Sequence, residues 1–491
     1  MMRALALAAL VAQASPLPSP TPTGPIYAGN PAVRFTLESH PLGVSPDGAA
    51  RWLVEARFFD ANGMPTRILA NSDIGWSAPG AYVQWQTRMR YGTPAAIVST
   101  TRDGPLRIEA RAHVPAIGSA VASTDTRAWP AARVVARALG PHLVQVGWFP
   151  RERGAIRIVR LDGRGVRTVV ATLAGGSTFR DASVRPGVHY RYVVERAHEP
   201  RVALAPVLTP PDPPPSSIAN ASGVGMWLFF TNDPLDDIYV GKLDPRAIVA
   251  QAVRAHLHYI ELRTAYGGFW EITPTAKPIV DAIVDGLAEH GIRTIGWTVP
   301  RDLSFEDLRQ SVRTATYRTA RGTPLVGVAV DLERGPEFMG GAPEGLGALA
   351  SYARVLRGAL GPAALVVATV EDPYLEHLKA DDYPYAAIAR SASVLQPMSY
   401  WRMMRRTPTS PEQVRTLLRA SYEKLRYFAG RPIPISMGGQ TVAAGRNGAP
   451  SPAEIAASIA TSRSLGALGI CYFDWDGTGP ELWRALERDQ W

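Results

Sequence analysis

The chain has almost no cysteine, since Cys471 is the only one among 491 residues. A single thiol cannot form an internal disulfide, so hydrophobic cores must hold the domains together. It also cannot build a zinc site from cysteine ligands. Cys471 lies in an apolar strand pattern, and we interpret it as a small buried apolar residue.

The chain also lacks long apolar runs. Residues 4–12 form a short apolar stretch after Arg3, and Ala12-Gln13-Ala14 fits a signal-peptidase site. This stretch is too short to span a hydrocarbon layer of about 30 Å. We therefore expect a signal peptide at 1–14 and a bacterial protein that is secreted, periplasmic or on the cell surface. We expect no transmembrane segment in the mature chain, which would begin with a stiff Pro-rich tether at 15–31.

Lysine is scarce, with 4 Lys against 48 Arg, and the net charge of +9 is unevenly distributed. Residues 1–215 contain 24 Arg and 14 acidic residues, whereas residues 216–491 are nearly neutral. The segment 128–208 alone has 13 Arg and 5 acidic residues. Such a module could hold an anionic cell-envelope surface, or could simply be a solvated basic surface. Motifs for base stacking or helix insertion are missing, so we expect no nucleic-acid partner.

Short alternating strands separated by turns fill residues 32–127 and 128–208, which is typical of β-sandwiches. The phrase FFDANGMPTR (58–67) resembles a strand and turn of bacterial immunoglobulin-like domains of the invasin kind. The second segment resembles a fibronectin type III domain, with Trp148, the step Phe179-Arg180-Asp181 and the pattern PGVHYRY at 186–192. These resemblances imply two β-sandwiches that space or bind and contain no catalytic residues.

The pattern changes after a Pro-rich linker at 209–221. Over residues 222–491, short apolar runs alternate with amphipathic helical stretches, which gives eight strand–helix units. That number in about 270 residues predicts a (β/α)8 barrel. A doubly wound sheet is the alternative, but the glycine-rich phosphate loop that it would need does not follow Phe230. The expected strands are 225–230, 259–263, 293–297, 326–331, 365–369, 394–398, 433–437 and 469–473.

The fourth strand carries the strongest candidate for chemistry. Its sequence, VGVAVDLE at 326–333, places Val326, Val328, Val330 and Leu332 on one face. The other face is small until Asp331 and Glu333. Active sites of closed parallel barrels lie at the carboxyl ends of the strands. The two carboxylates therefore suggest acid–base chemistry on a sugar.

The other strand ends add polar and aromatic side chains, as a sugar-binding cleft requires. The candidate substrate-binding residues are Glu261, Arg263, Trp297, Gln396, Met398, Trp401, Phe473, Asp474, Trp475 and Asp476. Several of them could instead have a purely structural role. Glu261 and Arg263 could form a buried ion pair, the tryptophans could be core or lid residues, and Asp474 and Asp476 could cap the last helix. We predict no metal and no cofactor.

Asp331 and Glu333, together with the Met398-Ser399-Tyr400 segment, resemble the family 18 chitinase-like glycoside hydrolases. The resemblance implies that Glu333 donates a proton to the glycosidic oxygen. Asp331 would hold the substrate acetamido group, and Tyr400 would donate a hydrogen bond to its carbonyl. Phe473 in the last strand would lie near the sugar site.

Half of the family pattern is missing. The two earlier acids of D-x-x-D-x-D-x-E fall on Val326 and Ala329, and Trp401 replaces the Asp after Tyr400. Family 25 lysozyme-like hydrolases also place D-x-E at the fourth strand. Glu333 could instead pair with Glu261 or Asp474 across about 5 Å (retention) or about 6.5–9.5 Å (inversion).

We therefore predict an exported glycoside hydrolase-like protein that cleaves a cell-wall or extracellular polysaccharide. The alternatives are a catalytically inactive, lectin-like barrel that binds glycan and an envelope adhesion or scaffold protein.

Overall fold

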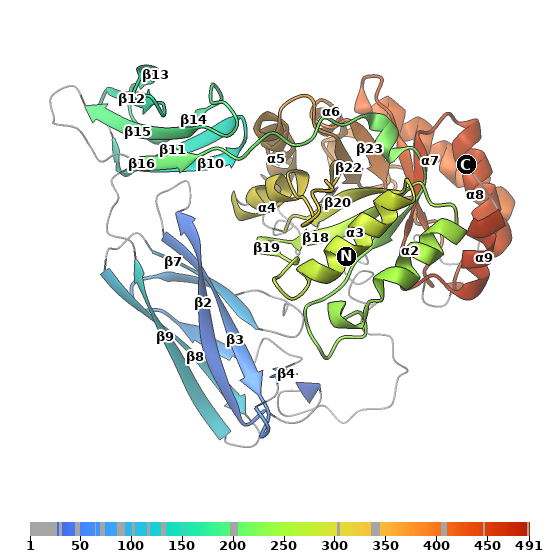
Figure 1. Cartoon of the computed structure of the whole chain (residues 1–491), viewed down its shortest axis with the longest axis horizontal. Helices are drawn as coiled ribbons and strands as arrows, with labels where there is room; N and C mark the ends of the chain where they lie inside the picture. The colour runs from blue at the N-terminus through green and yellow to red at the C-terminus, as the bar shows by residue number, and fades with distance from the viewer. Residues whose placement is uncertain are drawn as a thin grey trace.

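The structure is a computed structural model. It describes residues 27–28, 32–44, 50–63, 65–68, 74–85, 94–100, 104–114, 118–128, 134–152, 154–196, 205–301, 305–334, 344–403, 410–444, 447–488 and 491. The expected signal peptide and most of the expected tether lie outside these residues. Figure 1 shows two antiparallel β units beside a larger unit of parallel strands and helices.

The first β unit has two antiparallel sheets. One has the order β1-β4-β3-β7-β6 with β2 paired to β3, and the other has the order β5-β8-β9. Two hydrophobic clusters, which include Phe58, Trp52 and Ile108, contain residues of both sheets. The strands are β1 (Tyr27–Ala28), β2 (Arg34–Val44), β3 (Ala50–Phe59), β4 (Pro65–Ile68), β5 (Ile74–Ser77), β6 (Tyr82–Trp85), β7 (Ala95–Thr100), β8 (Gly104–Val114) and β9 (Gly118–Ala128). Strand β1 falls within the predicted tether, yet it pairs with β4.

The second β unit consists of the antiparallel sheets β10-β11-β14 and β13-β12-β15-β16. Its core contains Trp148, whose indole donates to the Gly176 carbonyl at 2.8 Å. Asp181 is buried and accepts hydrogen bonds from Tyr192 and Arg160. The strands are β10 (Val134–Gly140), β11 (Leu143–Glu152), β12 (Ile156–Leu161), β13 (Arg167–Leu173), β14 (Gly176–Asp181), β15 (His189–Arg196) and β16 (Ala205–Leu208). The immunoglobulin-like and fibronectin-like assignments and the domain boundaries stay predictions.

The third unit is a closed barrel of parallel strands, as the sequence predicted. Each strand pairs in parallel with its neighbour in the order β23-β22-β21-β20-β18-β17-β25-β24. Parallel bridges from Leu395 to Ile435 and from Met398 to Gly438 join the two end strands and close the ring. The strands are β17 (Gly223–Leu228), β18 (Tyr259–Tyr266), β20 (Arg293–Val299), β21 (Val328–Leu332), β22 (Val366–Val370), β23 (Val394–Pro397), β24 (Ser436–Gln440) and β25 (Gly469–Phe473).

A helix follows each barrel strand within the described residues. The helices are α2 (Pro245–Arg254), α3 (Lys277–Glu289), α4 (Phe305–Ala315), α5 (Glu344–Leu360), α6 (Tyr385–Ala389), α7 (Pro411–Ala429), α8 (Pro452–Ser464) and α9 (Pro480–Arg488). Three helices begin with a side-chain cap followed by proline: Asp244, Ser410 and Ser451 accept hydrogen bonds from backbone N–H groups of the first turn. A short hairpin strand, β19 (Phe269–Trp270), pairs with β18. No helix in the described part of the chain is long and apolar enough to cross a membrane.

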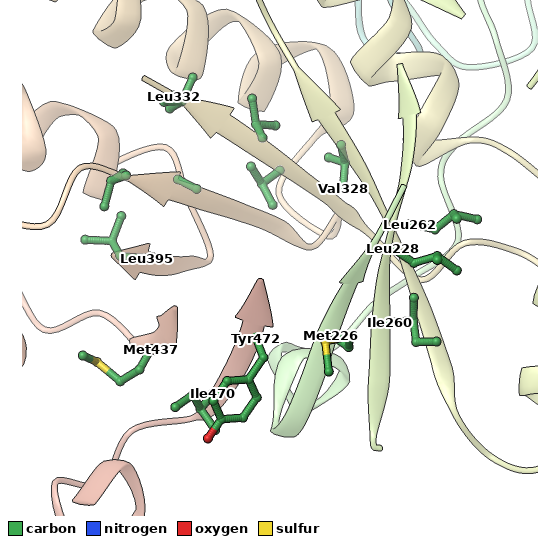
Figure 2. Close-up of a cluster of buried hydrophobic side chains, with 14 of the residues drawn as sticks. Met226, Leu228, Ile260, Leu262, Val328, Leu332, Leu395, Met437, Ile470 and Tyr472 are labelled. Carbon is green, nitrogen blue, oxygen red and sulfur yellow. The ribbon is translucent and has the colours of Figure 1, made fainter. Parts of the chain in front are cut away.

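The barrel has two apolar layers, one between the strands and the surrounding helices and one inside the ring of strands. The outer layer packs between strands and helices and includes Val330 of β21. Val328 and Leu332 of the same strand also belong to it (Figure 2). The inner layer contains Ala329 of the same strand. The predicted alternation therefore holds from Val328, where β21 begins, but Val326 packs against the inner layer.

Strand β24 differs most from its prediction, because it starts at Ser436 rather than Ile433. Pro432 and Pro434 lack the backbone N–H that a central strand must donate, so regular pairing begins after them. Gly438 then lies against β23, where a Cβ atom would come within 2.5 Å of the Pro397 carbonyl oxygen.

The second β unit contacts the barrel through β10, which touches α4 and α5. The His142 N–H donates to the Ala359 carbonyl at 3.3 Å, and Arg137 lies 3.5 Å from Glu306. The predicted linker 209–221 is also attached to the barrel, since the Ser216 hydroxyl donates to the Val326 carbonyl.

Candidate active site at the carboxyl ends of the barrel strands

Three carboxyl groups occupy neighbouring strand ends. Asp331 is the penultimate residue of β21 and is 4% exposed, while Glu333 directly follows the strand and is half-buried. Glu371 follows β22, the next strand of the barrel, and is also 4% exposed. Parallel pairing of β21 with β22 brings these acids to the same edge.

Arg334 connects the two strand ends. Its backbone N–H donates to Glu371 Oε1 at 2.9 Å, and its guanidinium Nε lies 3.7 Å from the same oxygen. A second guanidinium nitrogen lies 3.4 Å from Glu376 Oε2. One cation thus faces two carboxylates, and the chain directly after Glu333 is held against β22.

The charges around Asp331 favour its protonated form. Burial raises the pKa of Asp331 well above its usual value, and the carboxylates of Glu371 and Glu261 raise it further. The nearby polar groups of Glu333 and the Trp297 indole act in the opposite direction. The negative charges of Asp331 and Glu333 also help to raise the pKa of the buried Tyr400 phenol, so Tyr400 belongs to the same neighbourhood.

Aromatic rings cluster at the same end of the barrel. Trp227 and Phe229, at the end of β17 and just after it, meet Trp297, Tyr400 and Phe473 with ring centroids 6.0–6.4 Å apart. Phe229 and Phe473 are stacked at an interplanar angle of 13°. Trp227, Trp297, Tyr400 and Phe473 are each at most 6% exposed, whereas Phe229 is half-buried. Phe229 is therefore the ring of this cluster that a ligand could contact most easily.

A series of hydrogen-bonded polar side chains lies inside the barrel. The Gln396 amide donates to Glu261 Oε1 at 2.8 Å, and the Thr369 hydroxyl donates to Gln396 Oε1 at 2.9 Å. Glu261 has no exposed surface, and burial raises its pKa to about 7. The structure therefore places Glu261 and Gln396 inside the barrel. Met398 lies in the inner apolar layer.

Arg263 does not pair with Glu261, so the alternative of a Glu261–Arg263 ion pair is wrong. Its guanidinium donates to both Glu271 oxygens, at 2.7 and 3.2 Å, and to the Phe230 carbonyl. It also lies over the rings of Phe229, Tyr266 and Trp297. Arg263 thus borders the aromatic cluster.

Trp401, Trp475 and Asp476 lie outside this cluster, whereas Asp474 is close enough to Arg263 for their charges to interact. Trp401 has no exposed surface and lies in the outer layer, between barrel and helices. Trp475 packs against Trp483 of α9. Asp474 is 2% exposed and accepts from the Gly477 N–H at 2.7 Å, and Asp476 is exposed. Asp474 thus caps the turn that ends at Gly477, and not α9, which begins at Pro480; burial raises its pKa to about 7.

Sequence reasoning missed Glu371, Trp227 and Phe229. Glu371 is a single acid after the fifth strand, and nothing distinguished it from the adjacent Asp372. Trp227 and Phe229 alternate on the first strand, but that strand carries no charged residue that marks a site. Within the described ranges, no group of three or more His, Cys, Asp or Glu side chains is arranged to hold a metal ion.

No family model and no curated protein matches the sequence. Among solved structures, the chain is similar to the spore cortex-lytic enzyme SleL of Bacillus megaterium, with 14% identity over 60% of this chain and 79% of that chain and a TM-score of 0.38. It is also similar to a glycoside hydrolase family 18 N-acetylglucosaminidase of Paenibacillus barengoltzii (13% identity, 55% and 99% of the chains, TM-score 0.38). A chitinase of Chromobacterium violaceum gives 12% identity, 55% and 98% of the chains, and a TM-score of 0.37.

The three neighbours are thus a spore cortex-lytic enzyme, a chitinase and an N-acetylglucosaminidase of glycoside hydrolase family 18. Identities and TM-scores this low carry no argument about the activity or substrate of this chain. The barrel described above rests on the strand pairing of the chain itself.

Proposed function

We propose that the protein hydrolyses glycosidic bonds of a cell-wall or extracellular polysaccharide, with Glu333 as the general acid. The observation that carries this proposal is the pair of acids at the end of β21, in which Asp331 is buried and half-buried Glu333 is its neighbour. Burial and neighbouring carboxylates both favour the protonated form of a carboxyl group. The pair of Asp331 and Glu333 therefore retains a proton that it can transfer.

In the proposed reaction, Glu333 gives its proton to the glycosidic oxygen as the bond to the sugar carbon breaks. Bond cleavage leaves an oxocarbenium-like sugar carbon, and a water molecule then bonds to this carbon while it gives a proton to the Glu333 carboxylate. Asp331, whose protonated form burial favours, would share its proton with Glu333. Tyr400 would donate a hydrogen bond to a substrate carbonyl, and Phe229 would offer a face for stacking.

The test is hydrolysis by the full-length protein of peptidoglycan, chitin and acidic glycans, measured as released reducing ends. Glu333→Gln should lower the rate by about 100-fold or more, because general acid catalysis contributes about 10²–10⁴-fold, while glycan binding is retained. Asp381→Asn is the control, because Asp381 is an exposed acid of the same half of the barrel. Equal rates for wild type and Glu333→Gln on every substrate that is cleaved would refute the role of Glu333.

A second candidate is a barrel that binds glycan without cleaving it. The mutual burial of Trp227, Trp297, Tyr400 and Phe473 favours it, because these rings fill space that a deep sugar site would need. This candidate predicts saturable glycan binding by the wild type, with no reducing ends released from any of the substrates. It also predicts weaker binding by Phe229→Ala.

We also propose that the chain is modular and that the basic second β unit holds the barrel on an anionic cell-envelope surface. Arg164, Arg185 and Arg191 are exposed on this unit, which supports the proposal. Other arginines are already used for structure, since Arg160 binds Asp181 and Arg137 faces Glu306. An adhesion or scaffold protein would need this basic surface but no catalytic activity of the barrel.

A further inference from the structure

We propose that Glu371 is a positioning residue of the site: its carboxylate holds the peptide that carries Glu333 and places a negative charge beside Asp331. Its effect on catalysis rests on the proposed function, whereas its effect on Asp331 can be measured without any substrate. The inference comes from the contacts of Arg334, from the anchoring of the β22 end and from the charges that face Asp331.

The contact with Arg334 fixes the direction of Glu333. The N–H that donates to Glu371 Oε1 at 2.9 Å belongs to the peptide bond between Glu333 and Arg334. Orientation of that bond limits where the Glu333 side chain can point. The Arg334 guanidinium also reaches Glu376 and the Asp382 carbonyl, so the segment is held from several directions.

Glu371 itself is firmly placed. The Tyr385 hydroxyl donates to its backbone carbonyl at 2.9 Å. The next residue, buried Asp372, accepts from the hydroxyls of Ser399 and Ser421 and from the N–H groups of Tyr374 and Leu375. On the neighbouring strand, the Tyr383 hydroxyl donates to the Leu332 carbonyl at 2.6 Å. Both strand ends are therefore anchored within two residues of the acids.

Asp331 faces groups from several barrel elements. Glu371 comes from β22, Glu261 from β18, the Trp297 indole from β20, and Glu333 from its own segment. The Tyr400 and Tyr383 phenols are also close enough to be affected by its charge. Among the charged neighbours, Glu371 raises the pKa of Asp331 most, ahead of Glu261. Glu371 thus favours a proton on the Asp331–Glu333 pair.

A purely structural ion pair between Glu371 and Arg334 is the competing explanation, and two substitutions separate it from the proposal. Glu371→Gln keeps an oxygen that can accept from the Arg334 N–H but removes the charge. Glu376→Gln is the matched control, because it weakens the hold on Arg334 without removing a charge that acts on Asp331. The proposal predicts that only Glu371→Gln changes the titration of Asp331.

The direct measurement is infrared spectroscopy of full-length protein with labelled aspartate, in which the carbonyl band of protonated Asp331 is identified by its loss in Asp331→Asn. Without the Glu371 charge, the band should disappear at a pH lower by about one unit, the size expected for a neighbouring like charge. In Glu376→Gln it should disappear at the wild-type pH. An unchanged titration in Glu371→Gln, or an equal shift in both variants, would overturn the inference.

Kinetics then distinguish this inference from the proposed function. If glycan is cleaved, the alkaline limb of the pH–rate profile should move to lower pH in Glu371→Gln, with kcat changed more than KM. If the wild type cleaves nothing, the proposed function fails while the infrared result still decides the role of Glu371.

Discussion

Glu261 shows what complete burial does to a single carboxyl group. Burial raises the pKa of Glu261 from 4.5 to about 7. Below about pH 4.5 both the folded and the unfolded chain hold this proton, so the group has no effect on stability. Between pH 4.5 and 7 the unfolded chain releases the proton and the folded chain keeps it. The free energy of unfolding should therefore fall by up to about 3.5 kcal/mol over this window, at about 1.4 kcal/mol per pKa unit.

We predict that Glu261→Gln removes this loss of stability, because glutamine keeps the acceptor for the Gln396 amide but cannot ionise. Urea unfolding of wild type and variant at pH 5 and at pH 8 measures the effect. The variant should gain stability relative to wild type at the higher pH. Glu289→Gln, at a side chain 57% exposed and paired with Arg321, is the control and should follow the wild-type pH dependence. Parallel curves for wild type and Glu261→Gln would contradict the prediction.

At the same scale, the sequence predicted residues that share a strand face better than residues that meet across strands. Asp331 and Glu333 were found because their spacing of two follows directly from strand geometry. Glu371 was missed because its relation to Asp331 depends on the pairing of β21 with β22, which no local pattern reveals. Trp401 was expected at the site because it follows Tyr400, yet the chain turns after β23 and sends its ring into the outer layer.

Elements were predicted more closely than individual contacts. Strand β25 matches its predicted range, and α2 and α7 each begin at a proline that follows a capping residue. These elements have clear punctuation, such as a cap followed by Pro, or a Gly at the end. Strand β24 was misplaced because its apolar residues Ile433 and Ile435 precede the region that can form continuous hydrogen bonds.

Closure of the barrel depends on close backbone contact between β23 and β24. We predict that Gly438→Ala lowers the free energy of unfolding by about 1–3 kcal/mol, the usual cost of overpacking a core. The added methyl group would lie 2.5 Å from the Pro397 carbonyl oxygen, and backbone cannot move aside as a side chain can. Gly358→Ala in α5 is the control, because no atom lies within 4 Å of its added Cβ and alanine favours helix. Equal stability of the two variants in urea would show that β23 and β24 tolerate separation.

At the scale of the whole molecule, the barrel and the second β unit are in direct contact. A Cβ atom at Gly140 of β10 would lie 2.6 Å from the Ala359 carbonyl oxygen of α5, so the two units approach to backbone distance. Burial raises the pKa of Glu306, and the charges of Arg309 and of Arg137 from the β unit counter this rise. The β unit is therefore held against the barrel, and a ligand of one unit would be carried close to the other.

This arrangement leads to a prediction about surface binding by the full-length protein. Replacing Arg164, Arg185 and Arg191 together by Gln should weaken co-sedimentation with a phosphate-rich cell-wall preparation severalfold at low salt. The difference should vanish at high salt, because exposed charges are screened beyond about 10 Å at 0.1 M salt. Binding should weaken because the variant lacks three exposed cations. Other arginines of this unit, such as Arg160 and Arg137, are already paired with acidic side chains.

The matched control removes the same charge from the barrel, through Gln at the exposed positions Arg419, Arg431 and Arg463. If the charge of the second β unit matters specifically, this variant should sediment like wild type. Equal weakening of both triple variants would mean that only net charge counts, and the proposed surface role would fail.

Vesicles of anionic phospholipid form a second arm of the experiment. Binding to the vesicles, with none to the cell-wall preparation, would assign the basic unit to a lipid surface and contradict binding to a cell-wall polymer. Because the β unit contacts the barrel directly, loss of retention should also slow hydrolysis of insoluble wall while leaving soluble fragments unaffected.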